Sequence, residues 1–112
     1  MRLLLAGLTG AVLLFAQQAS APGQLERVAL IHGGAGPFAV AGARMGEEAL
    51  RRLGLPRGSF DLEVVHHAPR EVQWSCIIDG LQAATGASVG KLNLRLVETT
   101  RNEVYSVVRN RK

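Results

Sequence analysis

Cys76 is the side chain with the sharpest chemical potential in this sequence, and it is the only cysteine. It begins the stretch CIIDGLQAATG, which predicts a helix with Ser75 placed as its N-cap. The partial positive charge at a helix N-terminus favours a thiolate, the form of cysteine that acts as nucleophile or metal ligand. The alternative is inert packing, because cysteine is among the most buried residue types. One cysteine cannot form a disulfide within the chain.

Three histidines are the other candidate bases or ligands: His32, His66 and His67. None stands at zinc-finger spacing from Cys76. His66 and His67 are neighbours in a predicted strand, so they point to opposite faces and cannot both enter one site there. His32 closes an apolar segment immediately before a glycine-rich turn, which makes it the stronger candidate of the three.

Two glycine-rich stretches could bind an anion. The turn HGGAGP at positions 32–37 leads into a predicted helix N-terminus, which suits an anion, although its glycines could equally serve tight packing. The stretch TGASVGKLNL at positions 85–94 resembles a P-loop only superficially, because three residues rather than four separate Gly86 from Gly90 and Leu92 follows Lys91. It also leaves a helix and enters a strand, so we expect no nucleotide there.

The elements that must position these groups follow from hydrophobic periodicity. The apolar run RVALIH at positions 27–32 predicts a short buried strand. Positions 37–53 predict a helix, ended by Gly54 and Pro56. Positions 60–68 predict a strand and positions 75–85 a second helix, ended by Gly86. Two further strands, at 91–98 and 103–108, are predicted to form an antiparallel hairpin around TTRN. The expected apolar stripe of the first helix is Phe38, Ala41, Met45, Ala49 and Leu53.

This order of elements predicts an α+β fold, with two helices packed on one face of a small mixed or antiparallel sheet. The opposite sheet face would be bare. In the strand at 91–98, Leu92, Leu94 and Leu96 alternate onto one side. We therefore expect a homodimer, because association of two copies would cover such an apolar surface.

The first 21 residues have the order of a secretory signal peptide: Arg2, an apolar run from Leu3 to Ala16, then small and polar residues. The run has 14 residues, short of the roughly 20 that a spanning helix needs. We expect cleavage after Ala21 or Ala19, one folded domain at 22–112, a periplasmic or secreted location and no permanent membrane span.

Composition excludes some partners. Of the 112 residues, 47% are hydrophobic and 20% charged, as in an ordinary globular chain. The formal net charge of +4 is mild, and the basic residues near the C-terminus lack the interleaved aromatic residues that would stack on bases. We expect no nucleic acid partner.

Two blocks, HGGAGPFAVAGARMGEEAL at 32–50 and CIIDGLQAATGASVGKLNL at 76–94, resemble the E-subunit family of formylmethanofuran dehydrogenase. The chain is similar to a short, exported, bacterial-type member without the C-terminal zinc ribbon. The second block is the more specific one. Its family-like register consists of Cys76, Asp79, Gly80, Gln82, Thr85, Gly86, Gly90, Lys91 and Asn93.

The resemblance implies an α+β domain arranged like the catalytic domain of glyceraldehyde-phosphate dehydrogenases, usually dimeric, with a cleft near a histidine and a cysteine. By this resemblance His32 and Cys76 are the metal-site or active-site positions. Gly34 stands where a second histidine would be, so the motifs keep two of the three or four ligands that zinc needs, unless His66 or His67 supplies a third. The expected ligand-binding residues are Gly33, Gly34, Asp79, Lys91 and Asn93.

Three functions remain open on these grounds. The first is an exported domain that binds a small ligand or a divalent metal such as zinc. The second is a thiol-dependent enzyme in which Cys76 is the nucleophile and His32 its base. The third is a structural protein whose cleft is vestigial.

Overall fold

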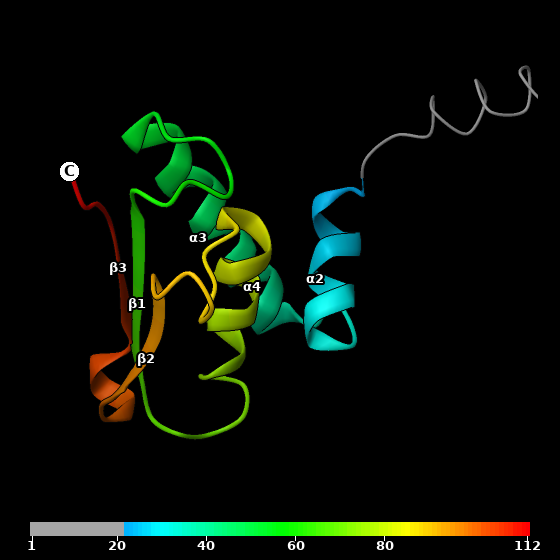
Figure 1. Cartoon of the computed structure of the whole chain (residues 1–112). Coiled ribbons are helices and arrows are strands. Elements are labelled where there is room, and N and C mark those ends of the chain that lie inside the picture. Colours follow the sequence, from blue (N-terminus) through cyan, green and yellow to red (C-terminus); the bar gives the residue numbers. More distant parts are fainter. Residues whose placement is uncertain (1–21) are drawn as a thin grey trace, which may run out of the picture.

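The computed structural model describes residues 22–112, and the predicted signal peptide at 1–21 lies outside the described residues. The fold is α+β, as predicted, and residues 22–112 form three helices, one more than predicted, and a three-stranded mixed sheet (Figure 1). None of the helices formed by residues 22–112 is long and apolar enough to cross a membrane. The elements are α2 (Gln24–His32), α3 (Pro37–Leu53), β1 (Leu62–Ala68), α4 (Cys76–Thr85), β2 (Leu94–Glu98), the 3₁₀ turn η1 (Arg101–Glu103) and β3 (Tyr105–Asn110).

The strand predicted at positions 27–32 is wrong, because these residues belong to helix α2. A short apolar run fits a buried strand or a helix equally well, and contacts with the rest of the fold decide between them. Here Val28 is buried against α3 and α4, while Leu30 remains 78% exposed. The helix ends at Gly33, whose left-handed φ of 87° lets its N–H bond to the Ala29 carbonyl.

Helices α3 and α4 pack at very short range through small residues. A Cβ atom added at Gly80 would overlap the Ala39 carbonyl oxygen, and one added at Gly42 would overlap the Ile77 carbonyl oxygen. The predicted helix at 37–53 is confirmed, but its predicted apolar stripe is only partly right, because Ala41 and Met45 are exposed. The side that packs is Ala39, Gly42, Ala43 and Gly46.

The predicted hairpin between the last two strands is wrong. The sheet order is β2-β1-β3, so β1 lies between them, parallel to β2 and antiparallel to β3. β2 ends at Glu98 beside Ala68, and β3 begins at Tyr105 opposite His67. The intervening residues 99–104 pass the end of β1, where the Thr99 N–H bonds to the Ala68 carbonyl. That segment is long enough to span two strand spacings, roughly 10 Å.

The helices lie on one side of the sheet, with α4 between the sheet and α2 (Figure 1). The register places Leu94 beside Val64 and Leu96 beside His66, so these leucines face the helices and not the bare side expected for them. Leu92 precedes the strand, 84% exposed. The core under the helices is formed by Leu62, Val64, Ile77, Leu81, Ala87 and Leu94. The open face carries Glu63, Val65, His67, Arg95, Val97, Tyr105, Val107 and Arg109.

Candidate functional site

His32 and Cys76, 44 positions apart in the sequence, line one cavity of about 170 Å³. His32 is the last residue of α2, Pro37 begins α3, and Cys76 begins α4, so the cavity forms where three helix ends meet. The lining residues are His32, Gly36, Pro37, Phe38, Ala39, Val72, Gln73 and Cys76. We call this cavity the Cys76 pocket.

Asp79 holds the imidazole of His32. Its Oδ2 atom lies 2.7 Å from His32 Nδ1, and the side chains of Asp79 and His32 are 36% and 25% exposed. Asp79 follows Cys76 by three residues, which places both side chains on one face of α4. An ionised carboxylate accepts a hydrogen bond from Nδ1–H, and the neutral ring then carries its free lone pair on Nε2. The pairing therefore prepares His32 to accept a proton at Nε2.

The Cys76 sulfur receives a backbone hydrogen bond from the loop that precedes α4. The Gln73 N–H donates to Sγ at 3.4 Å, and Gln73 adopts a left-handed φ of 79°. That conformation costs a residue other than glycine about 1 kcal/mol or more. Ser75 precedes the helix as predicted, but its hydroxyl makes no capping hydrogen bond. The hydrogen bond to the sulfur of Cys76 therefore comes from the loop backbone and not from a helix cap.

His66 anchors the same loop from the sheet. It is fully buried, with Nε2 2.9 Å from the Trp74 carbonyl oxygen and Nδ1 2.8 Å from Ser106 Oγ. The neutral ring satisfies both contacts, because Nε2–H donates to the carbonyl while Nδ1 accepts from the hydroxyl. Burial lowers the pKa of His66 below its ordinary value, which favours that neutral ring. Trp74 in turn packs edge-on against Phe38, a lining residue of the Cys76 pocket.

The two histidines suggested as a third metal ligand do not line the Cys76 pocket. His66 is turned to Trp74 and Ser106, and His67 lies on the open sheet face, stacked on Tyr105 with ring centroids 4.2 Å apart. Within residues 22–112, no group of three or more His, Cys, Asp or Glu side chains is placed to hold a metal ion. A zinc site needs three or four protein ligands, so the donor set of this part of the chain does not fit a resident zinc ion.

Two of the expected ligand-binding residues organise a different region. Lys91 donates through Nζ to the Gly86 carbonyl, and Asn93 is 1% exposed. Asn93 Oδ1 accepts the Ser88 N–H at 2.9 Å, which closes the loop before β2. Neither residue lines the Cys76 pocket, and neither do Gly33 and Gly34, which form the turn after α2.

The residues that sequence reasoning missed are Phe38, Ala39, Val72 and Gln73, all of which line the Cys76 pocket. Phe38 belongs to the predicted helix stripe, and Val72 and Gln73 lie in a loop without a recognisable motif. The positive φ of Gln73 has no signature in the sequence, because glycine or asparagine would normally mark such a position.

A family model described as FmdE, molybdenum formylmethanofuran dehydrogenase operon, matches residues 31–112. The match spans most of the chain and includes both blocks that carried the resemblance. No curated protein matches the chain. The chain belongs to the FmdE family, which confirms the prediction made from those blocks.

Proposed function

We propose that this member of the FmdE family binds a small molecule in the Cys76 pocket and that Cys76 reacts with it as a nucleophile. The observation that carries the proposal is the 2.7 Å contact between His32 Nδ1 and Asp79 Oδ2 at a cavity that Cys76 also lines. A base that is held by a third group and shares a cavity with a thiol supplies the groups that nucleophilic catalysis requires.

Each group has one role in the proposed step. The Cys76 thiol passes its proton to His32 Nε2, and Asp79 stabilises the imidazolium that results. The thiolate, supported by the Gln73 N–H, forms a sulfur–carbon bond with an electrophilic carbon of the ligand, and a leaving group departs with its electron pair. At about 170 Å³, the cavity is below the roughly 300–1,000 Å³ of sites for drug-sized ligands, so the ligand is small.

Iodoacetamide tests the proposal, because Cys76 is the only thiol and one mass increment reports its reaction. The new sulfur–carbon bond replaces the carbon–iodine bond, and iodide leaves. We expect the folded protein to react near neutral pH, and His32→Ala to slow the reaction by about tenfold or more. His67→Ala, which changes a histidine on the open sheet face, is the matched control.

Two results would contradict the proposed function. A thiol that reacts only after unfolding would make Cys76 a packing residue. An unchanged rate in His32→Ala would remove His32 as its base.

We further propose that the open sheet face pairs two copies of the chain. Helices cover the other face only, and at the centre of the open face Val97 and Val107, the latter 42% exposed, flank the buried Val65. Association is the usual way for a soluble protein to cover such a surface.

We also propose that residues 1–21 are a signal peptide that is removed on export. Sequencing the N-terminus of the mature protein tests this proposal, and we expect that N-terminus to follow Ala19 or Ala21.

A further inference from the structure

A second and larger cavity lies away from the Cys76 pocket. It is a groove of about 470 Å³ between α3 and β3. Its wall on α3 is formed by Met45, Glu48, Ala49, Arg52 and Leu53, and its wall on β3 by Ser106 and Val108. The lining is apolar along Met45 and Ala49 and charged at Glu48 and Arg52. We call this cavity the β3 groove.

β3 is an edge strand, and its alternation shows which backbone groups face outward. The N–H of Arg111 bonds to the Asp61 carbonyl, and the register pairs Leu62 with Asn110. In an antiparallel ladder the residues that bond to the partner strand alternate. Tyr105, Val107 and Arg109 therefore bond to β1, while the N–H and C=O groups of Ser106, Val108 and Asn110 face away from it. Those outward groups have no hydrogen-bond partner among residues 22–112.

The same two residues of β3 supply outward backbone groups and line the β3 groove. Ser106 and Val108 present unpaired backbone at the strand edge, and their side chains line the groove on the helix side. A strand added beside β3 would point every second side chain to that same side. The edge can thus supply main-chain hydrogen bonds while the groove receives side chains, the two parts of recognition by strand addition.

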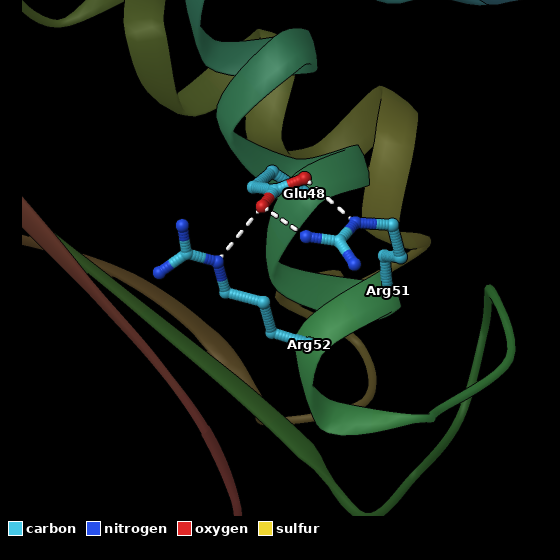
Figure 2. Close-up of polar contacts among 3 residues, drawn as sticks. All are labelled: Glu48, Arg51 and Arg52. Carbon is cyan, nitrogen blue, oxygen red and sulfur yellow. Dashed lines mark hydrogen bonds and ion pairs between the residues drawn. The ribbon is translucent and has the colours of Figure 1, made fainter.

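Glu48 and Arg52 line the α3 wall of the groove, and Arg51 lies beside them on α3, outside the lining. Glu48 is shared between two guanidinium groups, at 2.9 Å from Arg51 Nε and 2.8 Å from Arg52 Nε (Figure 2). Two cations around one carboxylate leave one charge uncompensated. Because Arg51 also binds Glu48, the charge of Arg52 is only partly compensated, and its side chain is 73% exposed, so it can contact a ligand in the groove. An acidic side chain is the complement of Arg52.

We propose that the β3 edge and its groove bind an extended segment of a partner protein as a fourth strand, with an acidic side chain at Arg52 and an aliphatic side chain against Met45 and Ala49. A second copy of β3 fits less well. Its Arg109, followed by Arg111 and Lys112, would bring further positive charge to Arg52, which already shares its carboxylate partner with Arg51.

The probe is a short peptide with blocked ends in which every second residue is threonine. The residues between the threonines are valine, glutamate and valine in that order, so that one face of the extended peptide carries the acid between two aliphatic side chains. We expect it to perturb the amide resonances of Ser106, Val108 and Asn110 and to slow their hydrogen exchange. In the free protein these amides should exchange faster than those of Val107 and Arg109, because they lack partners. Binding should disappear when the backbone of the peptide is N-methylated at its pairing positions.

Charge and edge are tested separately. Arg52→Glu should weaken binding by about tenfold or more, whereas Arg44→Glu, at an exposed position on the same helix outside the groove, should leave the affinity unchanged. Val108→Pro removes one outward N–H at an edge, where proline is tolerated, and should abolish binding. Circular dichroism and thermal unfolding verify that each variant is folded. If Val108→Pro does not fold, the affinity of Arg52→Glu alone tests the proposal.

Three results would overturn the proposal. One is equal binding of a peptide with lysine in place of glutamate. Another is peptide-induced shifts confined to the Cys76 pocket or to the open sheet face. The third is that, without peptide, the Ser106 and Val108 amides become more protected from hydrogen exchange as the protein concentration rises. That result would show that a second copy of the chain pairs with this edge.

Discussion

Asp79 decides which nitrogen of His32 can accept a proton. Because its carboxylate takes the hydrogen bond from Nδ1–H, replacing it with the isosteric amide should leave the fold intact but remove the charge that stabilises the imidazolium. We expect Asp79→Asn to slow alkylation of Cys76 by about tenfold. The measurement is the rate of iodoacetamide addition across the pH range, with Asp61→Asn as the control at a distant carboxylate. A rate and pH profile equal to those of the unmodified protein would exclude a positioning role for Asp79.

His66 links stability to pH. Burial lowers its pKa in the folded protein below the ordinary 6.5, so the unfolded chain binds more protons in the intervening range. The stabilisation from the neutral ring is fully present above that ordinary value and is lost as the pH falls through the lower folded value. We expect the free energy of unfolding in urea to decrease between neutral pH and about pH 5.

The variant His66→Phe should reduce this pH dependence while lowering stability at all pH values, because Ser106 and the Trp74 carbonyl lose their partner. Ser106→Ala, which keeps the imidazole, is the control and should retain the dependence. If His66→Phe and the unmodified protein show the same slope of stability against pH, His66 does not provide the linkage.

At the scale of elements, the contact between α3 and α4 depends on the absence of side chains. A Cβ at Gly80 would overlap the Ala39 carbonyl oxygen, so the helices would have to separate. We expect Gly80→Ala to destabilise the protein by about 3 kcal/mol. Chemical denaturation measures this loss. Gly90→Ala, where an added Cβ meets nothing within 4 Å, is the control. Equal stability of the two variants would show that the helices lie further apart.

At the scale of the whole molecule, helices on one side of a three-stranded sheet leave the other side open (Figure 1). If two copies pair through that face, a charge at its apolar centre should separate them. We expect light scattering to give the mass of a dimer for the unmodified protein and of a monomer for Val107→Lys. Val89→Lys, at a 72% exposed position in the loop before β2, should remain a dimer. A monomer in all three cases would refute the pairing.

Local signals in the sequence were enough for much of the fold. The helix at 37–53 follows from its periodicity and its Gly54 end, and the helix that starts at Cys76 follows in the same way. The strand over His66 and His67 follows from β-branched residues and alternation. Each of these signals lies within one element, so no distant contact is needed to interpret it. The family also follows from two continuous blocks.

The tertiary structure decided whatever depends on contacts between distant residues. Residues 27–32 form a helix because Val28 finds its neighbours on α3 and α4, not in the sheet. β2 and β3 each pair with β1 and not with each other, although only residues 99–104 separate them in the sequence. The short connection therefore did not determine which strands pair. The sequence by itself identified His32, Cys76 and Asp79 as candidates. Only folding could bring Asp79 to Nδ1 of His32 and turn His66 away from the pocket, since both depend on how separate helices and strands pack.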